Sequence, residues 1–137
     1  LIFWKYKKEI WQPLMFAASS LLLSTALTQI TRFFYYRPRP FLDFSINTLI
    51  NHSSTSSFPS SHSVFFFALA LVIFYLNRRW SWLFISGAFL ISLARISAGV
   101  HWPLDVLGGI ILGFLSVFFI KSLFPSLTKN TILRKDY

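Results

Sequence analysis

The sequence predicts an all-α protein, a polytopic membrane helix bundle with four transmembrane spans. Of the 137 residues, 55% are hydrophobic and only 12% are charged, whereas soluble domains carry about 25% charged residues. The apolar residues also fall into four windows in which the only charged side chain is Asp105, near the start of the fourth. A high aromatic content, including 17 Phe, suits helices that face lipid. These three observations together place the chain in a membrane.

These four apolar windows locate the expected spans, because a helix needs about 20 residues to cross the hydrocarbon core. They lie between Glu9 and Arg32, from Ser61 to Asn77, from Trp80 to Ala94 and from Pro103 to Ile120. The last three windows are short for a span. Snorkelling Lys and Arg side chains and local thinning of the bilayer absorb such a mismatch.

Residues 1–137 are expected to form a single integral-membrane domain, because no linker or internal repeat divides the chain. The chain begins at Leu1, and its Lys-rich opening leads directly into an apolar run too long for a signal-peptide core. We therefore expect one or two further spans upstream of this sequence.

Between the first two windows lies a polar segment, residues 37–60, which is long enough to be functional. Within it, Phe41–Leu49 is predicted to form a short interfacial helix.

The net charge of +9 divides between the two sides of the membrane. Lys5, Lys7 and Lys8 precede the first window, and four crossings place Arg78 and Arg79 on the same side. The residues after the fourth window bring further positive charge to that side: Lys121, Lys129, Arg134 and Lys135. Because Lys and Arg accumulate in short cytoplasmic loops, we expect the termini and the Arg78/Arg79 loop to be cytoplasmic.

The opposite, extracytoplasmic side is poor in Lys but rich in Arg and His. It receives Arg32, Arg37, Arg39, His52, His62, Arg95, His101 and Asp105. A bound anion explains positive charge on this side. Nucleic-acid binding is a poor explanation, since the basic residues are dispersed along membrane flanks instead of gathered on one soluble face. His52 has no motif around it and is interpreted as an ordinary loop residue.

Residues 95–105 carry the strongest functional signal, because ionisable groups at membrane depth usually mark function. His101 and Asp105 are four residues apart at the start of a predicted helix and can share one face. A carboxylate behind an imidazole fixes its tautomer and stabilises its cationic form. Arg95, six residues upstream of His101, offers the planar donor fork that suits a phosphate.

Three segments are expected to converge on the extracytoplasmic side and to enclose a phosphoryl group. Arg32, Arg39 and Arg95 would neutralise its charge. His101 would attack phosphorus, and His62 would protonate the departing oxygen. A helix N-terminus with nearby hydroxyl groups would add an anion-binding concavity, and its residues are Ser60 and Ser61.

Each of these residues taken alone also has a structural explanation. Arg37 and Arg39 could snorkel to headgroups, the histidines could be interfacial, and Asp105 could cap the fourth helix. Their joint occurrence favours the functional interpretation.

Gly109 and Gly113 form a Gly-x3-Gly step that predicts close helix packing.

The motifs resemble those of the type 2 phosphatidic acid phosphatase (PAP2) superfamily, whose signatures are Lys-x6-Arg-Pro, Pro-Ser-Gly-His and Ser-Arg-x5-His-x3-Asp. Here they read Arg32-x6-Arg39-Pro40, Pro59-Ser60-Ser61-His62 and Ala94-Arg95-x5-His101-x3-Asp105. The resemblance implies that His101 forms a phosphohistidine, with Asp105 as its partner and His62 as the acid. It also implies that the Arg residues and the Ser60–His62 turn hold phosphate, with no metal or other cofactor.

Three positions depart from the family pattern: Arg32 replaces Lys, Ser61 replaces Gly and Ala94 replaces Ser. Arg for Lys keeps the charge but changes reach and donor geometry. Ser61 adds a side chain where the backbone was expected to approach phosphate closely. The missing hydroxyl at Ala94 removes one expected phosphate contact. None of the three changes removes a chemical step.

A finer resemblance is to bacterial undecaprenyl-diphosphate phosphatases, carried by the segments 37–41, 57–60 and 99–109. It implies release of phosphate from a polyprenyl diphosphate on the outer leaflet, which recycles the carrier lipid for cell-wall synthesis. A lipid diphosphate or phosphate taken from the bilayer is the expected partner. Arg37, an extra cation beyond the motif, is hypothesised to bind the second phosphate.

Other functions remain open at this stage. A phosphatidate or phosphatidylglycerophosphate phosphatase, or a lipid phosphotransferase, would share the same site. A non-enzymatic alternative is an anion transporter or channel subunit. A path that conducts anions should place ionisable residues along the interiors of the spans, whereas here they cluster at one end of the predicted helices. The sequence leaves the oligomeric state undetermined.

Overall fold

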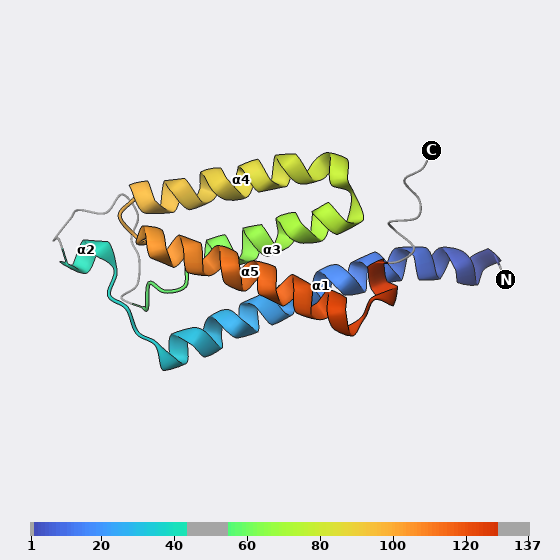
Figure 1. The fold of residues 1–137 in the computed structure, drawn as a ribbon, viewed down its shortest axis with the longest axis horizontal. Helices are drawn as coiled ribbons and strands as arrows, with labels where there is room; N and C mark the ends of the chain where they lie inside the picture. The colour runs from blue at the N-terminus through green and yellow to red at the C-terminus, as the bar shows by residue number, and fades with distance from the viewer. Residues whose placement is uncertain (1, 44–54, 129–137) are drawn as a thin grey trace.

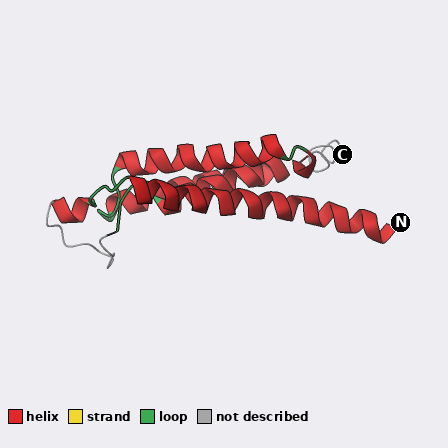
Figure 2. Cartoon of the chain, turned by 90° about the horizontal axis from the view of Figure 1, so that it is seen from below, coloured by secondary structure: helices red, strands yellow, loops and turns green. Residues whose placement is uncertain are grey.

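The computed structural model describes residues 2–43 and 55–128, and within these ranges it is helical without a strand (Figure 2). This confirms the all-α class. The helices are α1 (Ile2–Phe34), α2 (Pro40–Asp43), α3 (Ser61–Leu76), α4 (Arg78–Ser97) and α5 (Pro103–Leu123). His52, Lys129, Arg134 and Lys135 lie outside the described residues, as do the side chains of Lys5, Lys7 and Lys8.

The long helices follow the four predicted windows. α1, α4 and α5 extend beyond their windows, whereas α3 ends one residue before its window does. α1 begins at Ile2, well before the window that was expected after Glu9. Charged residues limit how far a helix can sit in hydrocarbon, but they are good helix formers and do not end it. In the described chain the short interfacial element spans Pro40–Asp43, one residue earlier than expected. Residues 44–54, which hold the rest of the predicted Phe41–Leu49 helix, lie outside the description.

Within the described residues, three helices are long and apolar enough to cross a membrane: Ile10–Phe34 within α1, α4 and α5. α3 is also apolar, but with 16 residues it is shorter. The chain is therefore a multi-pass membrane protein. A fourth crossing by α3 and additional upstream spans stay predictions.

The bundle is built around α3, which packs against α4, α5 and α1, while α1 also packs against α5. α3 and α4 form an antiparallel pair joined at Asn77 (Figure 1). Asn77 is the N-cap of α4, and its side-chain oxygen accepts a hydrogen bond from the backbone N–H of Arg79 at 3.1 Å. Figure 1 shows α2, the entry to α3 and the α4–α5 connection at one end of the bundle. The N-terminus and the α3–α4 connection lie at the other end.

Two glycines allow α5 to approach α3 closely, as the Gly-x3-Gly step predicted. A Cβ at Gly109 would lie 2.8 Å from the Cβ of Ser63, and one at Gly113 would lie 2.7 Å from the carbonyl oxygen of Val64. Both distances are shorter than real Cβ atoms tolerate. Only glycine fits at these contacts, so the spacing of α3 and α5 is fixed by sequence.

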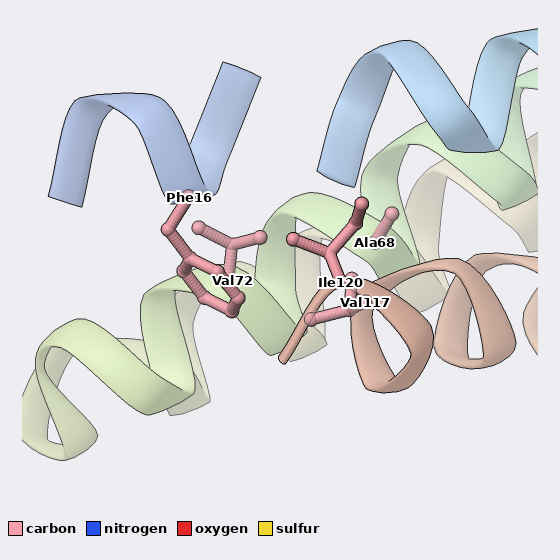
Figure 3. Close-up of a cluster of buried hydrophobic side chains, with 5 residues drawn as sticks. All are labelled: Phe16, Ala68, Val72, Val117 and Ile120. Carbon is pink, nitrogen blue, oxygen red and sulfur yellow. The ribbon is translucent and has the colours of Figure 1, made fainter. Parts of the chain in front are cut away.

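A small apolar core lies where α1, α3 and α5 meet (Figure 3). It consists of Phe16, Ala68, Val72, Val117 and Ile120. The outer surface is also apolar, with Leu22, Phe33, Trp82 and Leu90 among its strongly exposed side chains. In a soluble protein such a surface would favour aggregation. In lipid it costs nothing, which is consistent with a membrane bundle.

Candidate active site

Hydrogen bonds join the three predicted segments at the α2 end of the bundle. Arg32 Nη2 donates to the carbonyl oxygen of Pro59 at 3.0 Å, linking the end of α1 to the entry of α3. Arg39 Nη1 donates to the carbonyl oxygen of Val100 at 3.0 Å, linking the first segment to the third. The N–H of Ser60 donates to the carbonyl oxygen of Asp105 at 3.1 Å. The expected convergence is therefore present.

His101 lies in the turn between α4 and α5, and its side chain is only 1% exposed. Gly99 makes the turn possible, because its φ of +69° is a conformation that other residues rarely adopt. The His101 Nδ1 atom lies 2.9 Å from the carbonyl oxygen of Ser57. A carbonyl oxygen can only accept, so Nδ1 carries the proton in the neutral ring and Nε2 keeps the lone pair. A nucleophilic imidazole needs this tautomer.

Asp105 lies close behind His101 but is not its nearest hydrogen-bond partner. Its Oδ2 is 3.6 Å from His101 Nδ1 and accepts a hydrogen bond from the N–H of Trp102 at 2.8 Å. That second contact satisfies a free amide at the start of α5. Asp105 therefore satisfies an amide at the start of α5 and also lies beside the ring of His101. The hydrogen bond that orients the ring is donated by His101 Nδ1 to the carbonyl oxygen of Ser57, a contact that the sequence did not predict.

Burial lowers the pKa of His101 below the usual histidine value. Asp105 opposes this shift because its negative charge favours the imidazolium form, while Arg39 and Arg95 favour the neutral ring. The ring is consequently uncharged at neutral pH, as attack on phosphorus requires.

Arg39 is almost fully buried, with 2% of its surface exposed. Besides its bond to Val100, its Nε donates to the carbonyl oxygen of Thr55 at 3.1 Å and its Nη2 to the hydroxyl of Thr55 at 3.2 Å. Burial and the neighbouring Arg32 and Arg95 lower its pKa, yet a guanidinium remains charged at any physiological pH. The structure thus holds a fixed positive charge beside the His101 turn.

Arg32 and Arg95 complete the cationic group, from the last turns of α1 and α4. The Nε of Arg32 is buried and has no hydrogen-bond partner within the described part of the chain. A buried, unsatisfied donor is costly, and an anion would satisfy it. His62 interacts electrostatically with Arg95, His101, Arg32 and Arg39. Arg39 and Arg95 therefore act on both the predicted acid and the predicted nucleophile.

The start of α3 places His62 and Ser61 at the surface and Ser60 inside. Ser60 is fully buried, and its hydroxyl caps α3 by accepting from the N–H of Ser63 at 3.5 Å. With its own N–H bonded to Asp105, Ser60 already has partners for both groups, so Ser61 is the better candidate for a phosphate contact. A cavity of about 290 Å³ opens beside Ser61 and His62, and Phe65 and Phe66 form its apolar wall.

Arg37 has partners that the sequence did not predict. Its Nη1 donates to Asp105 Oδ1 at 2.9 Å, and its guanidinium carbon lies 5.5 Å from the centre of the Trp102 ring. Its hypothesised contact with a second phosphate stays a prediction. In the structure, its negatively charged neighbour is Asp105.

Several residues of the site were missed by sequence reasoning. Ser57 and Thr55 act partly through backbone carbonyl groups, which every residue possesses and no motif reveals. Phe58 packs its ring against Gly108, where a Cβ would collide with it. Ser57, Phe58 and Gly108 lie in the segments 57–60 and 99–109 that carried the finer resemblance, but these contacts were not predicted. Within residues 2–43 and 55–128, no group of three His, Cys, Asp or Glu side chains could hold a metal ion.

Known proteins resemble this chain over most of its length. A family model described as the PAP2 superfamily matches residues 13–129. Bacitracin transport permease protein BcrC of Bacillus licheniformis is 34% identical over 115 residues, which cover 83% of this chain and 57% of that protein. Undecaprenyl-diphosphatase BcrC of Bacillus subtilis is 32% identical over 115 residues, covering 81% and 60% respectively. The chain thus spans less than two thirds of the length of these relatives.

A solved structure shares the fold. The crystal structure of Aquifex aeolicus LpxE superimposes with a TM-score of 0.72 at 28% sequence identity, and the match covers 88% of this chain and 72% of that chain.

Proposed function

Because the chain belongs to the PAP2 superfamily, we propose that it is an integral-membrane lipid phosphatase that hydrolyses a polyprenyl diphosphate to the monophosphate and inorganic phosphate. Undecaprenyl diphosphate is the substrate we propose. One observation carries the proposal. Arg32, Arg39 and Arg95 gather around His62 and His101 at one end of the bundle.

The proposed reaction has two steps. The Nε2 lone pair of His101 attacks the terminal phosphorus and forms a P–N bond, while the bond from phosphorus to the bridging oxygen breaks. His62 gives its proton to that oxygen, and the lipid monophosphate leaves. In the second step water attacks the phosphohistidine, His62 accepts a proton from the water, and the P–N bond breaks. Inorganic phosphate leaves and both histidines return to their starting states.

Electrostatics favour the transition state over the ground state in this arrangement. Positive charge from Arg32, Arg39 and Arg95 surrounds the position where negative charge spreads over the phosphoryl oxygens. Arg39 is fixed by its bonds to Thr55 and Val100, so its charge is positioned before the substrate arrives. Such preorganised charge needs little rearrangement during reaction.

The substrate is proposed to reach the site from the bilayer. The cavity beside His62 has an apolar wall of Phe65 and Phe66, which suits the start of a lipid tail. We place the site on the extracytoplasmic face of the plasma membrane, with the termini and the Arg78/Arg79 turn in the cytoplasm. Support for this topology comes from the exposed arginines at the opposite end of the bundle.

Phosphate release measured in detergent with EDTA tests the proposal. Purified chain is given undecaprenyl diphosphate, phosphatidate and phosphatidylglycerophosphate separately, with His101→Ala and Arg79→Ala as paired variants. We expect the diphosphate to be the best substrate, vanadate to inhibit, and only His101→Ala to be inactive. Preference for a monoester lipid would replace the substrate proposal. Phosphate appearing on an added acceptor lipid would indicate a phosphotransferase.

Absence of any phosphate release from all three lipids by the chain would contradict the enzymatic proposal. Flux of phosphate across vesicles containing the protein, without hydrolysis, would then favour the anion-transporter alternative. Arg32, Arg39, Arg95 and the two histidines form one local group. This argues for the enzyme, since a conducting path needs polar groups along its length.

A further inference from the structure

We propose that Arg37 is a positioning residue for the nucleophile, which acts on His101 through Asp105 and does not bind the substrate. This inference rests on the proposed phosphatase function. It gives Arg37 a different role from the second-phosphate contact that its extra charge first suggested.

The contacts of Arg37 form a closed circuit around the start of α5. Arg37 Nη1 donates to Asp105 Oδ1 at 2.9 Å, and the N–H of Trp102 donates to Asp105 Oδ2 at 2.8 Å. Trp102 Nε1 in turn donates to the carbonyl oxygen of Pro38, the residue after Arg37, at 3.0 Å. The guanidinium group also lies over the Trp102 ring. Each member of the circuit therefore restricts the others.

This circuit decides where the carboxylate of Asp105 sits. Asp105 is fully buried, and a buried carboxylate needs charged or hydrogen-bonding partners. Arg37 occupies one oxygen and Trp102 the other, which keeps Oδ2 at 3.6 Å from His101 Nδ1. At that distance Asp105 acts on the ring by charge, and the shorter Nδ1 contact is with Ser57. The tautomer that exposes the Nε2 lone pair is thus maintained from two sides.

Arg37 also moderates the charge of Asp105. An unpaired carboxylate next to His101 would favour the imidazolium form, which cannot attack phosphorus. The charged or titratable groups that face His101 are Asp105 from α5, Arg39 from the segment before α2, Arg95 from α4 and His62 from α3. Asp105 additionally faces Arg32 at the end of α1. Removing Arg37 takes away the cation in direct contact with the carboxylate and leaves the others in place.

A contact with a second phosphate would require Arg37 to leave Asp105. The Arg37 side chain is 24% exposed while Asp105 is fully buried, so its departure would strand a buried charge. Breaking such a pair is far more costly than losing an exposed one. The geometry therefore favours a permanent structural partner over a substrate ligand.

The test compares Arg37→Ala, Arg37→Lys and Arg79→Ala on a lipid diphosphate and a lipid monophosphate that the wild-type chain hydrolyses. We expect kcat of Arg37→Ala to fall about 10-fold or more on both substrates, with KM little changed, because a charge-assisted bond is lost. The acid limb of its kcat/KM profile should move to higher pH, since the unpaired carboxylate stabilises the imidazolium. Arg37→Lys should restore part of the activity and of the profile. Arg79, exposed at the other end of the bundle, should tolerate Ala.

A double-mutant comparison sharpens the result. If Arg37 acts through Asp105, Arg37→Ala should cost little more once Asp105→Asn is present. A loss confined to the diphosphate substrate would overturn the proposal and restore the second-phosphate hypothesis. Equal losses with an unchanged pH profile, no rescue by Lys and additive effects with Asp105→Asn would also overturn it. An inactive wild-type chain would instead contradict the phosphatase function itself.

Discussion

The two ends of the bundle both carry arginine, but they hold it in different ways. At the α2 end, Arg39 is buried and donates to the carbonyl groups of Thr55 and Val100. At the opposite end, Arg78 is exposed and its guanidinium carbon lies 5.1 Å from the centre of the Phe74 ring. Lys121 similarly lies 3.9 Å from the Tyr75 ring. The positive charge is therefore fixed by hydrogen bonds at the α2 end, whereas at the opposite end it only lies against aromatic rings.

The difference arises from the connections between helices. A helix uses its own carbonyl groups, so buried cations need acceptors from non-helical backbone. The α2 end has such backbone in the described residues 35–39, 55–60 and 98–102. At the other end, Asn77 alone separates α3 from α4, so this connection offers few free acceptors. Long connections therefore create the conditions for a rigid polar site, and short ones do not.

The largest expected effect comes from removing the proposed nucleophile. His101→Ala should lower phosphate release by at least about 1000-fold, because the covalent step has no substitute group. Steady-state phosphate release in detergent measures the effect, and trapping of a labelled phosphoenzyme should succeed only when His101 is present. Near-normal turnover in this variant would exclude the covalent mechanism. Asp105→Asn should cost less, since Asp105 orients the ring and does not react.

Arg39→Lys tests the idea that buried arginine at the α2 end depends on its fork of donors. One ammonium cannot reproduce three bonds to Thr55 and Val100, so we expect a loss in kcat/KM of about 100-fold. The matched change Arg78→Lys at the other end should leave kcat/KM within about twofold of wild type. If both substitutions had equal effects, the distinction between the two ends would be wrong.

Helix packing near the site offers a test based on stability. Gly109→Ala should destabilise the protein by about 1–3 kcal/mol, because the new methyl group overlaps Ser63 and the Ser60 carbonyl. Gly87→Ala in α4 is the control, since a Cβ there meets nothing within 4 Å. It should be neutral or stabilising by roughly 0.5–1 kcal/mol, because Ala is the better helix former. Unfolding midpoints in detergent compare the two variants.

The pH dependence of wild-type activity should reflect the buried His101. Its pKa is lowered by burial, so the neutral ring persists below the usual histidine value of about 6.5. As pH falls through the lowered pKa, the ring gains a proton and kcat/KM should decline. The measurement is a kcat/KM profile from acid to neutral pH. An acid limb centred above 6.5 would contradict the burial argument.

The smallest effect is expected at the end that lacks the site. Arg78→Ala removes a contact with the Phe74 ring that is worth about 0.5–1 kcal/mol at an exposed position. We expect a slight fall in the unfolding midpoint and unchanged phosphate release. A large loss of activity would show that this end communicates with the site.

The sequence alone determined the helical class, the approximate positions of the long helices and the glycine contact between α3 and α5. Its motifs also identified the polar residues that meet at one end. These features depend on local composition and residue spacing. An apolar window and a Gly-x3-Gly step can both be read directly from the sequence.

Tertiary structure decided how the polar residues are paired. It assigned Arg37 to Asp105, oriented His101 through the carbonyl of Ser57, and used Ser60 as the cap of α3. The pairings of Arg37 with Asp105 and of His101 with Ser57 join positions far apart in the chain. The second uses a backbone acceptor, which is the same for every residue type. A sequence motif can therefore name the reactive side chains, but only the folded backbone determines which atoms hold them in place.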